Sequence, residues 1–199
     1  MKDIVLDRVS FAYEDQPVLQ EFSLTLPAGH ITCLMGPSGC GKTTLFRLLC
    51  GSIAPLSGTI TGIPDRISAV FQEDRLCEDF SALSNLRFAV GSRPDKAELI
   101  ALLDSLGLEG DSPAPVRTFS GGMKRRVAIA RALAAKGDLL LLDEPFKGLD
   151  EETRAAAAKL LLARTAGKTV FVITHDPAEA KLLSAPVLEM SPDGHILHK

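Results

Sequence analysis

Apolar and polar side chains alternate through the first part of the chain, which is the pattern of strands with one buried face. Residues 4–13 alternate in this way, with Val5 and Val9 among the apolar positions. Residues 18–27 continue the pattern after a turn-like EDQP stretch. Such runs separated by a short turn predict two antiparallel strands at the N-terminus.

From residue 30 onward, short continuous apolar runs take turns with segments of helical periodicity. Runs of this kind suit parallel strands that are buried on both faces. Their alternation with helices is typical of an α/β core. The last two predicted strands flank SPDG, in which Pro192 and Gly194 suit a type I turn. The predicted strands are residues 30–35, 55–62, 66–72, 139–142, 169–174, 187–190 and 195–198, and the predicted helices are residues 42–50, 151–165 and 177–184.

The pattern changes between residues 74 and 118, where no strand-like run occurs. Residues 82–90 and 95–108 have helical periodicity, and residues 110–117 have the composition of a loop. We therefore predict a single domain, residues 1–199, with a helical insertion. Its parts would be an α/β core with N-terminal antiparallel strands, residues 1–73 and 119–199, and a helical subdomain, residues 74–118.

Composition narrows the class of protein. Of the 199 residues, 46% are apolar and 24% are charged, which is ordinary for a globular domain. The net charge of −3 gives no support to a surface that binds nucleic acid. The four cysteines lack metal-ligand spacing and are expected to be free thiols. Without an export signal or an apolar run of roughly 18 residues, we expect a soluble, cytoplasmic protein whose membrane role would come through a partner.

One motif predicts a phosphate-binding loop (P-loop). Residues 36–43, GPSGCGKT, fit G-x-x-x-x-G-K-[ST] between a predicted strand and a predicted helix. Its glycines let backbone N–H groups surround phosphate oxygens, Lys42 can reach the terminal phosphates, and the Thr43 hydroxyl can bind Mg²⁺. An ordinary tight turn is the alternative, and the flanking strand and helix argue against it.

An acidic pair ends one of the apolar runs. Asp143 and Glu144 follow the LLLL stretch, at the sheet edge where α/β proteins bind ligands. A carboxylate at Asp143 can hold Mg²⁺, and Glu144 can orient or deprotonate water. Many strands end in an acidic turn, but together with a P-loop the pair predicts hydrolysis rather than binding alone.

A second anion site is predicted at the start of another helix. Ser120, Gly121 and Gly122 open a segment in which Val127 and Ala130 belong to a helical apolar repeat. A polar cap followed by glycines leaves N–H groups at the helix start free to meet an anion. Because the P-loop already supplies one phosphate site, the second one needs an explanation.

Together these motifs resemble the nucleotide-binding domain of ABC transporters. The P-loop, FSGGM, LLLLDEPFKGLD and ITHD occur in this order, and the resemblance covers essentially the whole chain. It implies the ABC ATPase fold with ATP and Mg²⁺ as cofactors. It also implies that two domains pack head to tail, so that Ser120, Gly121 and Gly122 close over the ATP of the other chain. This would explain the second anion site.

The resemblance also implies roles for further residues. Tyr13 would stack on adenine, although an edge-strand aromatic is the alternative. Gln72 would reach the metal and the attacking water, and His175 would contact the γ-phosphate. Asp150 would cross the dimer interface and also cap the next helix. The implied catalytic residues are Glu144, His175 and Gln72; the metal ligands are Thr43, Gln72 and Asp143; the ATP contacts are Tyr13, Gly36, Pro37, Ser38, Gly39, Cys40, Gly41, Lys42, Thr43 and Thr44; and the contacts to the partner's ATP are Ser120, Gly121, Gly122 and Asp150.

The expected function is drawn from the same resemblance. Met123, with VFQEDRL and DEPFKGLD, is similar to the importer branch that handles nitrate, sulfonate and taurine-like solutes. The chain would then be an ATP-hydrolysing subunit that closes as a dimer around two ATP molecules and drives a separate permease. Its partners would be a second ATPase subunit, expected to be a second copy, the transmembrane permease subunits and an extracytoplasmic solute-binding protein. It would lie on the inner face of the membrane through the permease.

Two alternatives stay open. A non-transport ABC ATPase acting on nucleic acid or the ribosome usually needs coiled coils or a second ATPase domain, for which 199 residues leave little room. The basic residues Lys124, Arg125, Arg126 and Arg131 could form a functional patch. We favour a solvated helix face for these four side chains.

Overall fold

The computed structural model describes residues 2–91, 95–110 and 112–197. Its strands are β1 (Ile4–Tyr13), β2 (Gln16–Leu26), β3 (Ile31–Met35), β4 (Ser57–Thr61), β5 (Ile67–Val70), β6 (Leu139–Asp143), β7 (Thr169–Ile173), β8 (Val187–Met190) and β9 (Ile196–Leu197). Its helices are α1 (Lys42–Leu49), α2 (Ala82–Val90), α3 (Lys96–Asp104), α4 (Gly121–Ala134), α5 (Glu151–Arg164) and α6 (Pro177–Leu182), with a 3-10 turn at Val116–Thr118. In these ranges, no helix is both long enough and apolar enough to cross a bilayer.

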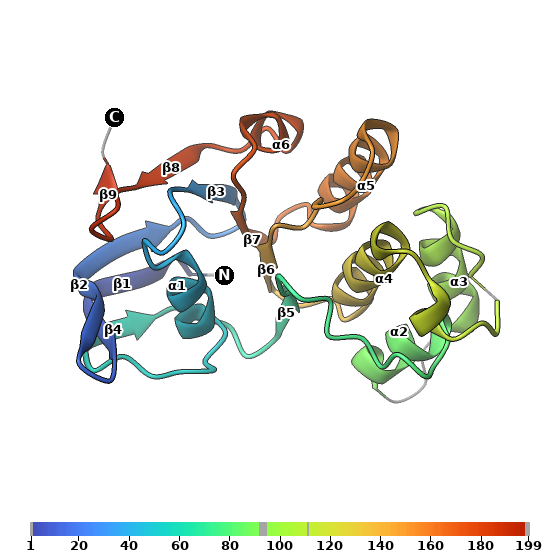
Figure 1. Cartoon of the computed structure of the whole chain (residues 1–199), viewed down its shortest axis with the longest axis horizontal. Coiled ribbons are helices and arrows are strands. Elements are labelled where there is room, and N and C mark those ends of the chain that lie inside the picture. The colour runs from blue at the N-terminus through green and yellow to red at the C-terminus, as the bar shows by residue number, and fades with distance from the viewer. Residues whose placement is uncertain (1, 92–94, 111, 198–199) are drawn as a thin grey trace.

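The predicted strands and helices are confirmed, with ends that shift by a few residues. Asp111 of the predicted loop, residues 110–117, and His198 of the last predicted strand, residues 195–198, lie outside the described residues. The strands form an antiparallel sheet of order β2-β1-β4 and a six-stranded sheet of order β5-β6-β7-β3-β8-β9. Figure 1 shows α1 beside the antiparallel strands at one end of the molecule and α2, α3 and α4 at the other end.

The six-stranded sheet is parallel from β5 to β8, and β9 runs antiparallel to β8. Every residue of β6 and β7 is buried, as their apolar runs predicted. Asp143 pairs with Ile173, and Leu34 of β3 pairs with the same residue. The carboxyl ends of the three central strands therefore meet at one edge of the sheet.

Helices cover both faces of this sheet. Leu139 and Leu141 of β6 belong to the apolar cluster that contains α1 and the antiparallel strands. Leu140 and Leu142 belong to the other cluster, which contains α2, α3, α4 and α5. Because successive side chains of a strand point to opposite faces, one apolar run serves both cores.

The alternation predicted for β1 is interrupted, so the prediction for Val5 was wrong. The core side chains are Ile4, Leu6 and Val9, whereas Val5 is only half-buried. The pairing with β2 shifts register between Leu6 and Val9, and Arg8 between them has a φ of 48°. A bulge of this kind adds a residue to one strand and exchanges the faces of the residues that come after it.

Helix α3 ends four residues before the end of the predicted helical segment. The N–H of Leu108 donates to the carbonyl of Leu103, and the N–H of Gly107 donates to that of Asp104. Gly107 has a φ of 67°. These bonds form a Schellman motif, in which a left-handed glycine stops the helix.

The basic residues of α4 do not form a solvated face, so that interpretation was wrong. All four bond to residues between β5 and α4, and Arg125 is buried. The acceptors come from chain segments distant in sequence, which the helical spacing alone cannot reveal. The contacts are Lys124 to the Glu78 carboxylate, Arg125 to the Asp74 carboxylate, Arg126 to the carbonyls of Leu106 and Gly107, and Arg131 to the carbonyls of Asp74 and Arg75.

We predict that Leu141→Ala lowers the free energy of unfolding by about 2–5 kcal/mol, the range for truncation of a buried leucine. Leu141 is fully buried at the centre of β6 and pairs with Phe171. The measurement is a urea titration. The matched control is Leu56→Ala, because the Leu56 side chain is 69% exposed, and it should change stability by less than about 0.5 kcal/mol. Equal effects of the two substitutions on the free energy of unfolding would contradict the burial of Leu141 in the core.

Candidate active site

Glycines shape the loop between β3 and α1. Gly39 and Gly41 have φ values of 83° and 106°, a region that side chains disfavour. A Cβ at Gly36 would lie 2.7 Å from the carbonyl oxygen of Met190 in β8. The loop therefore requires glycine at these positions, and it leads into the start of α1, where an anion is favoured.

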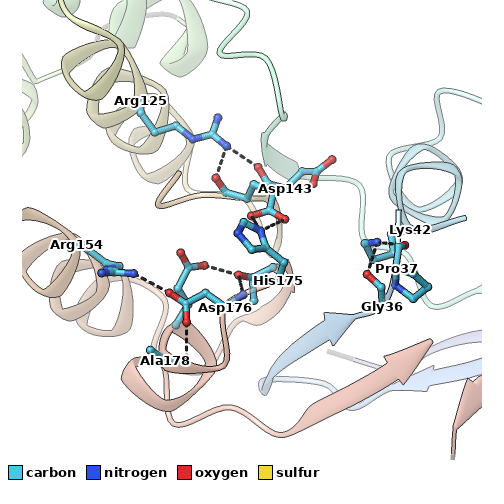
Figure 2. A network of polar contacts seen from close by, with 12 residues as sticks. Gly36, Pro37, Lys42, Arg125, Asp143, Arg154, His175, Asp176 and Ala178 are labelled. Atoms are coloured by element: carbon cyan, nitrogen blue, oxygen red, sulfur yellow. Dashed lines mark hydrogen bonds and ion pairs between the residues drawn. The ribbon is translucent and has the colours of Figure 1, made fainter. Parts of the chain in front are cut away.

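Lys42 begins α1 and turns back over this loop (Figure 2). Its ammonium donates to the carbonyl oxygens of Gly36, at 2.8 Å, and Pro37, at 2.7 Å. The buried Cys40 thiol lies 3.8 Å from the same nitrogen. The loop thus orients a positive charge beside its own backbone.

A pocket of about 430 Å³ opens beside the loop and brings together most of the residues predicted to bind ATP and metal. Its volume is in the range of small-molecule sites. Val18 and Ile173 are additions that the sequence patterns did not single out. The lining residues are Tyr13, Val18, Ser38, Gly39, Gly41, Lys42, Thr43, Thr44, Gln72, Asp143, Glu144 and Ile173.

Asp143 is a buried carboxyl group at the end of β6. Burial raises its pKa, and the neighbouring charge of Glu144 adds to the rise, while Arg125 and Lys42 oppose it. A bound cation would stabilise the ionised form of such a group. With Thr43 and Gln72 on the same pocket wall, the oxygen donors suit Mg²⁺, which takes few protein ligands and completes its shell from phosphates and water.

Glu144 comes next, with an unusual backbone conformation. Its φ of 50° lies in the left-handed region, which costs a residue with a side chain about 1–2 kcal/mol. The Glu144 N–H donates to the carbonyl of Ile173 at 2.9 Å. Its carboxylate accepts a hydrogen bond from Nδ1 of His175 at 2.8 Å. The turn thus aims the carboxylate at both the pocket and the histidine.

The bond to Glu144 changes the acid–base properties of His175. The hydrogen bond and the charge of Glu144 raise the pKa of the imidazole above its usual value. The His175 side chain is 73% exposed, so its ring can also meet a ligand that enters from outside. Glu144 lines the pocket and His175 does not, so the pair joins a proton acceptor in the pocket wall to a hydrogen-bond donor behind it.

A polar network that the sequence patterns did not indicate supports the turn that carries His175. The hydroxyl of Thr174 donates to buried Glu179 and accepts from the N–H of Asp176. Arg154 of α5 donates to the Asp176 carboxylate at 2.8 Å (Figure 2). The D-x-x-E spacing of Asp176 and Glu179, which marks a helix start, was the available signal for this network.

Tyr13 lies at the outer rim of the pocket. Its ring is 41% exposed and meets Phe11 edge to face, with centroids 5.0 Å apart. Its hydroxyl accepts from Arg47 of α1 at 3.0 Å. Tyr13 is the last residue of β1, the central strand of the antiparallel sheet, so the edge-strand alternative was wrong. Stacking on adenine stays a prediction.

The residues predicted to contact a partner's ATP lie elsewhere. Ser120, Gly121, Gly122 and Asp150 are all described residues, and none of the four lines the pocket. Ser120 caps α4 by accepting from the N–H of Met123 at 3.2 Å. A Cβ at Gly121 would meet no atom within 4 Å apart from its chain neighbours and the backbone of its own helix. Packing inside this chain therefore does not require glycine at position 121, and the helix start is open to approach from outside.

Asp150 caps α5, as its position predicted. Its carboxylate accepts from the N–H of Thr153 at 2.9 Å and from the Thr153 hydroxyl at 2.8 Å. These hydrogen bonds lower the pKa of Asp150. The predicted contact across a dimer interface stays a prediction.

The arrangement along one sheet edge defines the class of protein. A glycine-rich loop after β3, a carboxylate pair after β6 and a histidine after β7 are the parts of a P-loop nucleoside triphosphatase. The family model for ABC transporters matches residues 19–147. The chain therefore belongs to the ABC transporter family, whose ATP-binding subunits are ATPases.

Individual relatives agree with this family. The chain is 40% identical over 200 residues to the aliphatic sulfonates import ATP-binding protein SsuB 2 of Pseudomonas syringae pv. tomato (strain ATCC BAA-871 / DC3000), covering 99% of this chain and 85% of that protein. It is 40% identical over 194 residues to the taurine import ATP-binding protein TauB of Yersinia pestis bv. Antiqua (strain Antiqua), covering 90% and 76%. The dimeric structure of MJ0796, a bacterial ABC transporter cassette, matches with a TM-score of 0.86 and 27% identity over 98% of this chain and 97% of that one. The predicted ABC ATPase fold and the similarity to importer subunits are confirmed.

We predict that NMR titration of the imidazole signals shows a raised pKa for His175, and that Glu144→Gln returns it toward the usual histidine value. The substitution replaces the carboxylate whose hydrogen bond is the main cause of the rise, and it also removes the charge that adds to the rise. Because the folded-state pKa is raised, the pair stabilises the fold at pH values below the unfolded-state pKa, and this stabilisation is lost as the pH rises through the folded-state pKa. His175→Asn identifies the signal. An unchanged titration in Glu144→Gln would show that the two side chains are not coupled.

Proposed function

We propose that this chain is the ATP-hydrolysing subunit of an importer, and that two copies close head to tail around two ATP molecules. Closure would drive a separate transmembrane permease, and hydrolysis would reopen the dimer. The identity of 40% to sulfonate and taurine import proteins supports a solute of that class. An extracytoplasmic binding protein would deliver the solute.

One observation carries the proposal: the two helix starts suited to phosphate do not share a pocket. Lys42 at the start of α1 lines the pocket, whereas Ser120 at the start of α4 does not. In a head-to-tail pair, α4 of the second copy would meet the γ-phosphate from the side opposite the P-loop, which uses both sites. Similarity to a dimeric cassette supports the same arrangement.

Within the closed site, the residues of this chain would have distinct tasks. The P-loop N–H groups and Lys42 would hold the phosphates, and Tyr13 would stack on the adenine. Glu144 would orient the attacking water and accept its proton, while His175 would donate a hydrogen bond to the γ-phosphate. Mg²⁺, held by Thr43, Gln72 and Asp143, supplies charge neutralisation of the phosphates when bound.

The groove between the core, residues 1–73 and 119–199, and the helical subdomain, residues 74–118, would receive the permease's cytoplasmic helices near Gln72 and residues 73–79. Helices α2 and α3 of the helical subdomain pack on α4, which begins directly after Ser120. A displacement of α2 and α3 would therefore reach the residues that contact the partner's ATP. The protein would lie on the inner face of the membrane through its permease.

We predict that Glu144→Gln keeps ATP binding and lowers the rate of phosphate release at least about a hundredfold, because a general base contributes at least that factor. Lys42→Ala should weaken ATP binding roughly 10- to 100-fold, the value of hydrogen bonds to charged groups. Phosphate release and fluorescent-ATP binding measure the two effects. Exposed Lys159 in α5 provides the control, Lys159→Ala. Wild-type turnover by Glu144→Gln would remove Glu144 from the proposed role.

We predict that Ser120→Arg leaves ATP binding by the monomer unchanged and lowers hydrolysis at least about a hundredfold, because one missing oxyanion donor has an effect of that size. Exposed Ser57 in β4 provides the matched control, Ser57→Arg. If Ser120→Arg abolished ATP binding by the monomer, Ser120 would belong to the pocket of its own chain, contrary to the proposal.

A further inference from the structure

Arg125 is a buried cation in α4 whose contacts reach the candidate catalytic residues. Its side chain is 4% exposed. Nη2 donates to the carbonyl oxygen of Asp143 at 2.6 Å and to the carbonyl oxygen of Glu144. Figure 2 shows the guanidinium extending from its helix toward the end of β6. Through these two acceptors, Arg125 fixes the peptide groups on both sides of the Glu144 backbone.

The other side of the same guanidinium holds a different segment. Nη1 donates to the carbonyl oxygen of Phe71 at 2.6 Å and to the carboxylate of Asp74 at 2.9 Å. Phe71 and Asp74 lie on either side of Gln72, which lines the pocket. Because a guanidinium is planar and its donors have a fixed geometry, the two sets of acceptors cannot move independently while all four bonds persist.

The cost of this arrangement argues against a role in stability alone. In the part of the chain that the structure describes, Nε of Arg125 is the one buried side-chain nitrogen or oxygen atom without a hydrogen-bond partner. Burying a guanidinium with an unpaired N–H is unfavourable, and apolar residues of similar volume often stabilise such a site at least as well. The bonds to Glu144 and to the segment around Gln72 indicate that the arginine contributes to the geometry of the candidate active site as well as to stability.

We propose that Arg125 is a positioning residue that holds Glu144 in its catalytic orientation and makes this orientation depend on the segment from Phe71 to Asp74. The left-handed backbone of Glu144, with a φ of 50°, sets where its carboxylate points, and Arg125 holds the carbonyl of that residue. A partner that displaces the helices after Asp74 would therefore change the proton acceptor as well as Gln72. This inference rests on the proposed function and adds a route by which the permease would regulate hydrolysis.

Arg125→Met tests the positioning role, because loss of a positioning residue should lower kcat without changing the Kd for ATP. The P-loop is untouched, so the Kd for ATP should stay within about twofold, whereas kcat should fall at least about tenfold. Arg125→Lys keeps the positive charge but lacks the planar guanidinium with its several donors. It should lower kcat by less than Arg125→Met does. The matched control is Arg126→Lys, because Arg126 lies on the same helix and bonds the carbonyls of Leu106 and Gly107 without contacting β6. A wild-type kcat in Arg125→Met would overturn the proposal.

A double-mutant cycle with Glu144→Gln separates positioning from a general loss of structure. If Arg125 acts through the Glu144 carboxylate, Arg125→Met should lower the residual single-turnover rate of Glu144→Gln by less than about twofold. A further tenfold fall, equal to its effect in the wild type, would overturn the proposal. Circular dichroism checks the fold of each variant, and the cycle uses Arg125→Lys if the methionine variant does not fold.

Asp74→Asn tests the link to the segment around Gln72. It replaces the carboxylate of the ion pair by a neutral amide and leaves the bonds of Arg125 to the carbonyls of Phe71, Asp143 and Glu144, so kcat should fall about threefold or more. This effect should vanish in the Arg125→Met background, and its persistence there would contradict the link.

Failure of the proposed function looks different: the wild-type chain would then release no phosphate from MgATP, or Glu144→Gln would release it at the wild-type rate.

Discussion

The parallel pairing of β3, β6 and β7 is the constraint on which the candidate site depends. The register places Leu34, Asp143 and Ile173 side by side, so the residues that come after the three strands emerge at one edge. The P-loop, Glu144 and His175 are far apart in the sequence and adjacent in space for this reason. Burial of β6 and β7 on both faces holds the register, because a shift of one residue would exchange the side chains of the two cores.

The charged groups at this edge of the sheet differ in their partners. Asp143 and Glu144 are consecutive carboxyl groups, and Asp143 is buried. The ammonium of Lys42 is held on the carbonyls of its own loop, and Glu144 shares a hydrogen bond with His175. Burial raises the pKa of Asp143, and a bound cation would stabilise the ionised form of this group.

Helix α4 joins the parts of the molecule that the proposed cycle would move. It starts after Ser120, packs on α2 and α3, and reaches the end of β6 through Arg125. Its arginines bond to carbonyl groups of other segments as well as to carboxylates. A helix that was expected to show a solvated face is instead the element through which the segment after β5 contacts the candidate active site.

Local patterns in the sequence were sufficient to predict the strands, the helices and the P-loop, because hydrophobic periodicity and a glycine-rich segment between a strand and a helix are properties of consecutive residues. The order of the motifs was sufficient to indicate the family and most residues of the pocket, but not Val18 and Ile173. The bulge at Arg8, the buried network of Glu179 and the position of Arg125 were decided only by the tertiary structure. Each depends on acceptors or strand partners that are remote in the chain, and whether a charged side chain is solvated or buried is determined by the segments that pack over it.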